Sequence, residues 1–71
     1  MKEFKFNTGI HILEVLKETD LISSKKEGKR KIDEGAVQIN GRKILDYFFK
    51  FSKGEFVLKL GKKMIKIKII N

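Results

Sequence analysis

The chain has 71 residues, no cysteine, no tryptophan and a formal net charge of +8. A chain of this length forms one small domain, so we predict that residues 1–71 are a single domain that needs most of its apolar side chains for the core. Without cysteine there can be no disulfide and no thiolate chemistry, and no apolar run is long enough to cross a membrane, so we expect a cytoplasmic protein with no membrane partner.

The N-terminal part of the chain predicts a strand and a helix. Residues 2–6 alternate polar and apolar side chains, which is typical of a strand with Phe4 and Phe6 on one face. Residues 7–9 interrupt this pattern and offer a helix cap. Apolar residues then recur at helical spacing over residues 10–19, which predicts an amphipathic helix. Its buried stripe is expected to comprise Ile12, Leu13 and Leu16.

A second, basic helix is predicted between Ser24 and Gly35. Ser24 and Glu27 have the spacing of a capping box, in which the serine hydroxyl accepts from the backbone N–H of Glu27 and the carboxylate accepts from the N–H of Ser24. Glu27 and Lys31 have the i,i+4 spacing of an ion pair, and Gly35 can adopt the left-handed conformation that ends a helix. Gly28 and Ile32 fall together on one side of this helix.

A hairpin and an aromatic segment follow the basic helix. The Asn40-Gly41 pair tolerates positive φ and predicts a tight turn between residues 36–39 and 42–44. Residues 45–51 include four aromatic side chains without a clear period, so a strand, a 3₁₀ turn and an irregular loop all remain open. We favour the core for these aromatic side chains, with Tyr47 the most exposed, over a platform on which bases stack.

The C-terminal part predicts a longer hairpin, because residues 55–60 and 64–70 alternate apolar and polar side chains. A two-residue turn at Gly61-Lys62 brings apolar residues of the two arms together on one face. The expected pairs are Leu58 with Ile65 and Phe56 with Ile67, and the opposite face holds Lys59, Lys66 and Lys68. The elements together predict an α+β fold, with two short helices packed on a small, mostly antiparallel sheet.

Positive charge increases along the chain. Residues 1–23 carry three lysines against four acids, residues 24–49 seven basic residues against four acids, and residues 50–71 seven lysines against one glutamate. Such a domain is expected to bind a polyanion. The basic helix is short and has no row of side chains for reading a DNA duplex, so a folded RNA held by its backbone fits better. The cations on one flank of this helix are Lys26, Lys29 and Arg30, although many such runs are only solvated surface.

No catalytic constellation is visible in the sequence. Ser23 and Ser24 lack a neighbouring base, and the acidic residues are scattered among lysines. His11 has no second histidine, cysteine or acid at ligand spacing, so we expect a surface or edge position for it. We therefore expect no catalytic residue, no metal and no cofactor, and the chain is not expected to be an enzyme by itself.

Two motifs carry a resemblance to a known family. Residues 24–32 and 35–41 read Ser-Lys-Lys-Glu-Gly-Lys-Arg-Lys-Ile and Gly-Ala-Val-Gln-Ile-Asn-Gly, and they resemble the S-four-type (αL) RNA-binding domain, named after the fourth protein of the small ribosomal subunit. Residues 56–67 are similar to the closing segment of bacterial-type tyrosyl-tRNA synthetases. Gly28 stands where the family usually has alanine, which lowers helix propensity by about 1 kcal/mol.

The resemblance implies the C-terminal tRNA-binding domain of such a synthetase. A domain of this kind holds tyrosine tRNA on its anticodon and variable-arm side, while a separate catalytic domain performs ATP-dependent aminoacylation. That catalytic domain would be a further partner on the same polypeptide if the chain belongs to a longer protein. The RNA-binding residues that the resemblance implies are Ser24, Lys25, Lys26, Lys29 and Arg30, joined by Asn40, Arg42, Lys62 and Lys63.

Two alternatives remain open. One is an S-four-type module that binds ribosomal RNA in a ribosome-associated factor or an RNA-modification enzyme. The other is a protein-interaction domain whose lysines only confer solubility. The oligomeric state and the RNA element that is bound also remain open at this point.

Overall fold

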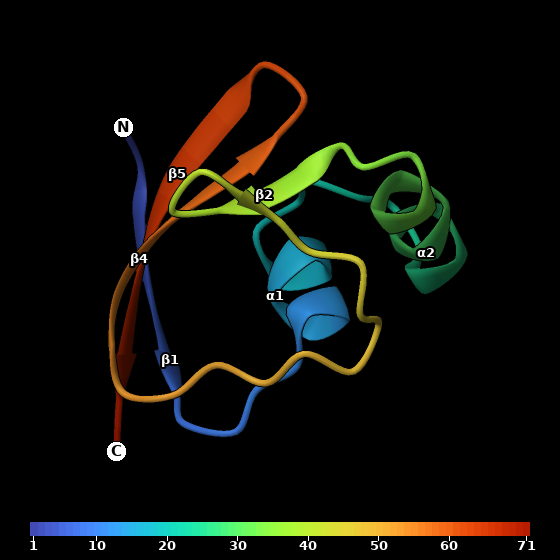
Figure 1. Ribbon diagram of the computed structural model, residues 1–71. Helices are drawn as coiled ribbons and strands as arrows, with labels where there is room; N and C mark the ends of the chain where they lie inside the picture. Colours follow the sequence, from blue (N-terminus) through green and yellow to red (C-terminus); the bar gives the residue numbers. More distant parts are fainter.

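The computed structural model describes all 71 residues, which form two helices and a five-stranded sheet (Figure 1). Both helices lie on the same side of the sheet, so the predicted α+β fold is confirmed. No helix has the length and apolar character needed to span a membrane. The strands are β1 (Glu3–Asn7), β2 (Val37–Ile39), β3 (Arg42–Lys43), β4 (Gly54–Leu60) and β5 (Lys63–Ile70), and the helices are α1 (Ile12–Glu18) and α2 (Lys25–Asp33).

The sheet has the strand order β1-β5-β4-β2-β3 and is antiparallel except where β1 pairs with β5. The predicted register of the β4–β5 hairpin is confirmed: Leu58 lies opposite Ile65 and Phe56 lies opposite Ile67. Leu60 pairs with Lys63, which leaves a two-residue turn between them. Because the side-chain period of a strand is two, this register places the apolar residues of both arms on the face that the helices cover.

The core lies between that face of the sheet and α1, with α2 packed beside α1 (Figure 1). It contains 14 buried apolar side chains. The predicted stripe of α1 is buried, which confirms that prediction, and Gly28 and Ile32, which share one side of α2, are buried as well. The fully buried side chains include Ile12, Val15, Leu16, Ile32, Val37, Leu58 and Ile67.

The helix-free face of the sheet carries charged side chains. Lys66 Nζ lies 2.9 Å from Oε1 of Glu55 and 4.0 Å from Oε2 of Glu3, so it joins three strands. The hydrogen bond with Lys66 holds the pKa of Glu55 below its ordinary value and raises the pKa of Lys66. Lys66 is therefore partly neutralised by Glu55 and Glu3.

Gly28 lies where α2 packs against Leu13 of α1 and Ile22 of the connector between the helices. A Cβ atom added at Gly28 would lie 2.7 Å from Cδ1 of Ile22 and 2.8 Å from Cδ2 of Leu13. Both distances are shorter than ordinary van der Waals contact. The glycine therefore lets the two helices pack closely, which gives a structural reason for its departure from the alanine usual in the motif.

The helix cap expected at residues 7–9 is wrong, because α1 begins later. His11 is the N-cap residue, and its backbone N–H donates to Oε1 of Glu14 at 3.4 Å. The backbone N–H of Thr8 donates to the Ile70 carbonyl at 2.9 Å, and that of Gly9 donates to the Phe51 carbonyl at 3.1 Å. Thr8 and Gly9 are therefore still bonded to neighbouring segments, and the helix begins only after them.

Residues 45–51 form an irregular loop, which is one of the conformations left open above. The preference for the core is right for Phe51, which is only 1% exposed, and Phe49 and Tyr47 are partly buried against the core. It is wrong for Phe48, which is 71% exposed and more exposed than Tyr47. Aromatic side chains of this loop therefore lie both inside the molecule and on its surface.

Candidate nucleic-acid interface

The N-terminus of α2 is capped by Ser24, and the Glu27 side chain holds the residue before the cap, Ser23. Ser24 Oγ accepts the backbone N–H of Glu27 at 3.2 Å, as predicted. The Glu27 carboxylate does not return to Ser24, however, because Oε1 accepts the backbone N–H of Ser23 at 2.7 Å and its hydroxyl at 3.2 Å. The hydrogen bond from the Ser23 backbone is the main reason why the pKa of Glu27 is lowered. The cap therefore fixes the conformation of the chain one residue before the helix.

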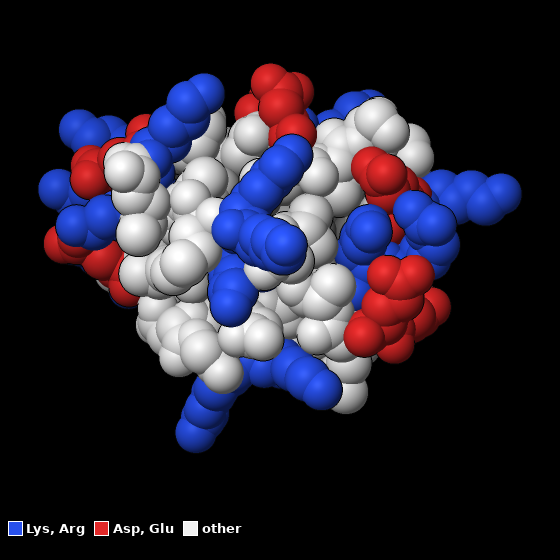
Figure 2. Space-filling model, turned by 90° about the horizontal axis from the view of Figure 1, so that it is seen from above, with Lys and Arg blue, Asp and Glu red and all other residues white.

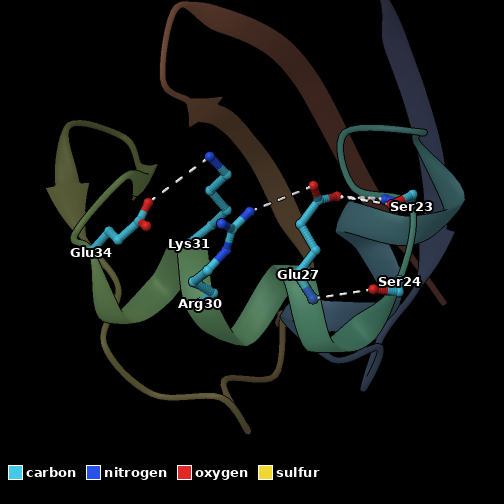
Figure 3. Close-up of polar contacts among 6 residues, drawn as sticks. All are labelled: Ser23, Ser24, Glu27, Arg30, Lys31 and Glu34. Atoms are coloured by element: carbon cyan, nitrogen blue, oxygen red, sulfur yellow. Dashed lines mark hydrogen bonds and ion pairs between the residues drawn. The ribbon is translucent and has the colours of Figure 1, made fainter.

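One side of α2 carries two ion pairs, one near each end of the helix (Figure 3). Arg30 Nη2 lies 3.8 Å from Oε2 of Glu27, and Lys31 Nζ lies 3.9 Å from Oε1 of Glu34. The predicted ion pair between Glu27 and Lys31 is wrong, because the nearer arginine takes the carboxylate. The Arg30 side chain remains 61% exposed and its contact is long, so it stays accessible to a further anion.

The adjacent flank of α2 carries three exposed lysines that make no ion pair, namely Lys25, Lys26 and Lys29. The carboxylate among them, Asp33, accepts a hydrogen bond from the hydroxyl of Tyr47. Lys29 Nζ instead lies 5.8 Å from the centroid of the Tyr47 ring, within the range of a cation–π contact. We call this surface, Lys25, Lys26, Lys29 and the neighbouring Arg30, the basic flank.

A hollow of about 620 Å³ follows the basic flank and the cap. Two of its basic side chains are those of Lys26 and Lys29, and Ser24 contributes its hydroxyl at the helix N-terminus. Exposed ammonium groups beside a helix N-terminus suit a phosphate, because the charges and the helix dipole have the same sign. The residues that line the hollow are Ser23, Ser24, Lys26, Glu27, Lys29, Arg30 and Asp33.

Asn40, one of the predicted binding residues, has a structural role in the β2–β3 turn. The backbone N–H of Asn40 donates to the Val57 carbonyl at 2.9 Å, and Asn40 Oδ1 accepts the backbone N–H of Val57 at 2.8 Å. Asn40 also has φ of 52°, a left-handed conformation that asparagine tolerates. The side-chain carbonyl of Asn40 therefore holds the turn on β4, whereas Arg42 on β3 is exposed.

The turn of the β4–β5 hairpin lies on the other flank of α2. Lys62 and Lys63 are exposed and share a hollow of about 270 Å³ with Lys31, not with the lysines of the basic flank. Figure 2, which looks onto the end of the molecule that carries this turn, shows basic side chains at several separate places with acidic ones among them. The predicted residues therefore do not form one continuous surface: the basic flank and the β4–β5 turn are two separate cationic surfaces, and Arg42 lies apart from both on β3.

Lys31 lies beside the β4–β5 turn, a position that its predicted ion pair with Glu27 does not indicate. The helical angle of Lys31, on the flank away from Lys29, is a signal that could have shown this separation. Lys43 was also missed: its side chain lies 3.5 Å from the position of a Cβ atom at Gly35, so it covers the C-terminal end of α2. A cation there is favourable because the helix dipole is negative at this end.

The chemistry available at these surfaces is ionic contact and hydrogen bonding. No cluster of three or more histidine, cysteine or acidic side chains could hold a metal ion. Lysine and arginine side chains and serine hydroxyls are typical partners of RNA phosphates. Their contribution to affinity falls steeply as salt concentration rises, because binding releases counterions from the nucleic acid.

Comparison with known proteins adds a family relationship. Residues 1–67 match the model of the tyrosine–tRNA ligase SYY-like C-terminal domain. Over 61 residues the chain is 38% identical to the tyrosine–tRNA ligase of Helicobacter pylori strain J99. The aligned segment covers 86% of this chain and 15% of that protein. The chain is 36% identical over 64 residues to the tyrosine–tRNA ligase of Clostridium perfringens strain 13. This aligned segment covers 83% of this chain and 16% of that protein. The chain thus spans only about one sixth of the curated relatives that it matches.

Proposed function

Because the chain belongs to the family of tyrosine–tRNA ligase C-terminal domains, we propose that residues 1–71 act as a single tRNA-binding domain. In this proposal the domain holds tyrosine tRNA by its backbone, and the ligase reaction takes place in a catalytic domain of the same polypeptide. The chain itself performs no catalytic step. A cytoplasmic location follows from the proposal, because tRNA is aminoacylated where translation takes place.

The observation that carries this proposal is the set of three unpaired lysines on the basic flank of α2. Three lysines project there without a carboxylate within 4.0 Å, next to a serine-capped helix N-terminus. Adjacent like charges without a partner repel each other and are not required for solubility. The phosphate backbone of an RNA would neutralise them. The proposed contacts are Ser24, Lys25, Lys26, Lys29 and Arg30 as the main surface and Lys62 and Lys63 at the β4–β5 turn as a second one. Arg42 is a further proposed contact at the β2–β3 turn, which Asn40 supports.

The proposal is tested by measuring the affinity of the chain for tyrosine tRNA by fluorescence anisotropy at several salt concentrations. A Lys26→Glu/Lys29→Glu variant is expected to bind at least about tenfold more weakly and to reduce the slope of log affinity against log salt by about two. A Lys5→Glu/Lys53→Glu variant is the matched control, because it changes the net charge equally at exposed positions outside the proposed surfaces.

Two results would contradict the proposal. If the unaltered chain fails to bind tyrosine tRNA, or if both double variants lose affinity equally, the basic flank is not a specific binding surface. Equal affinity for tyrosine tRNA and for a ribosomal RNA fragment of similar length would favour the alternative of a ribosome-associated module.

A further inference from the structure

Phe48 is an exposed aromatic ring at the border of the basic flank. Its side chain is 71% exposed, although it belongs to a domain with a small core and lies between the partly buried Tyr47 and Phe49. Water contact with an apolar ring is unfavourable, and a position in the core would stabilise the domain more. The exposure of Phe48 therefore requires a cause in the structure of the loop.

The loop holds Phe48 outward through contacts on both sides. Asp46 Oδ1 accepts the backbone N–H of Phe48 at 2.8 Å, and the Asp46 carbonyl accepts that of Phe49 at 3.3 Å. The Phe49 ring packs edge-on against Phe51 with centroids 5.2 Å apart, and the Phe49 carbonyl accepts the N–H of Ile12 at 2.9 Å. These contacts fix the backbone of the turn that carries Phe48, so the residue is exposed before any partner binds.

The surroundings of Phe48 combine an apolar surface with positive charge. A hollow of about 250 Å³ joins the ring to Lys25 and Lys29, which project from α2. Its one acidic side chain, Glu14, accepts the backbone N–H of His11. The residues that line the hollow are His11, Leu13, Glu14, Lys25, Lys29, Tyr47 and Phe48.

We propose that Phe48 is a stacking site for an unpaired nucleobase of the bound RNA, with the adjacent phosphates held by Lys25 and Lys29. This inference rests on the proposed function and names the part of the RNA that the site takes. A single-stranded nucleotide presents a planar apolar face and a phosphate within one residue, which matches a ring beside two ammonium groups. An apolar protein surface would cover the ring but would also bury the two lysines without a partner.

The test compares three variants of the chain in binding to tyrosine tRNA. Phe48→Ala is expected to weaken binding roughly five- to hundredfold. The slope of affinity against salt should stay unchanged, because no charge is lost. Leu45→Ala is the matched control: Leu45 is 68% exposed in the same loop but has no ring, so its replacement should leave affinity within about twofold. Phe48→Trp introduces the only tryptophan of the chain, and its fluorescence should be quenched by tRNA and not by a fully paired RNA duplex.

The outcomes separate this inference from the proposed function. If the unaltered chain binds tyrosine tRNA but Phe48→Ala binds equally well, or if Phe48→Trp shows no quenching, the stacking site is wrong and the proposed function stands. If the unaltered chain does not bind tRNA, both fail. If Phe48→Ala keeps its tRNA affinity and loses contact with the remainder of the ligase, Phe48 belongs to a protein interface and the inference is overturned.

Discussion

The hydroxyl of Tyr47 donates a hydrogen bond of 2.5 Å to Oδ1 of Asp33 and thereby ties the irregular loop to α2. Asp33 is the carboxylate nearest in helical position to Lys26 and Lys29, and this bond occupies one of its oxygens. The same bond, followed by burial, raises the pKa of the Tyr47 phenol. The relationship between these two residues therefore helps to keep the lysines of the basic flank unpaired.

Replacing Tyr47 with phenylalanine removes that hydrogen bond and releases Asp33. Because the freed carboxylate can then pair with Lys29, we expect Tyr47→Phe to lower the affinity for tyrosine tRNA roughly two- to fivefold. The Tyr47→Phe/Asp33→Asn double variant lacks this competing charge and should bind as well as Asp33→Asn alone. Anisotropy titrations of the three variants check the prediction, and unchanged binding by Tyr47→Phe would show that Asp33 does not compete with RNA.

Substitution of Gly28 tests the close packing of α1 and α2. An alanine gains about 1 kcal/mol of helix propensity, but its Cβ must displace the side-chain ends of Ile22 and Leu13. We expect these effects to offset each other, so Gly28→Ala changes the free energy of unfolding by less than about 1 kcal/mol. Gly28→Val adds bulk without propensity and should destabilise the domain by about 1–3 kcal/mol in urea denaturation. Stabilisation by valine would contradict the packing described for this site.

Asn40 is expected to contribute more to folding than to RNA contact. Asn40→Ala loses the hydrogen bond with Val57 and places a less tolerant residue at positive φ, so it should destabilise the domain by about 2 kcal/mol. Asn40→Gly tolerates that φ and should cost about 1 kcal/mol. Chemical denaturation measures both values. If folded Asn40→Gly loses tRNA affinity more than about threefold, the side chain has a direct role in binding.

Acid should weaken the cap of α2 through Glu27. A carboxyl group whose pKa is lowered by folding stabilises the folded state at pH values above its ordinary pKa of 4.5, and this contribution is lost as the pH falls through the lowered value. Glu27→Gln removes the charge at every pH. The difference in Tm between the unaltered chain and Glu27→Gln is therefore expected to be largest near pH 7 and to shrink below about pH 4.5.

The control for this pH series is Glu18→Gln, since Glu18 is exposed and makes no hydrogen bond or ion pair through its side chain. Glu18→Gln also replaces one glutamate by glutamine but breaks no contact of the cap, so it shows the effect of the substitution without the loss of the cap. A Glu27→Gln difference that is constant from pH 7 to pH 3 would contradict the capping role of the Glu27 carboxylate.

Features with a short sequence period could be predicted in detail. The alternation in β4 and β5 determines the register because a shift by one residue would turn Leu58 and Ile65 away from the core. The Ser24 cap could also be predicted, since the serine and its target are three residues apart. These features depend on neighbours within one element or one hairpin.

Features that depend on distant contacts could not be predicted. The outward position of Phe48 is set by Asp46 and by the packing of Phe49 on Phe51, and no period in the sequence reports either contact. The separation of Lys62 from the basic flank follows from where the β4–β5 turn lies relative to α2. A residue count along the chain cannot show this separation, because the two cationic surfaces come from elements far apart in sequence.

The assignment of RNA binding to α2 is tested most directly by a map of backbone amide shifts in the chain during titration with tyrosine tRNA. If α2 holds the RNA, residues 24–30 shift most, Phe48 and the β4–β5 turn shift with them, and the helix-free face of the sheet around Glu55 and Lys66 does not shift. Shifts confined to that sheet face, with residues 24–30 unmoved, would contradict the assignment of RNA binding to α2.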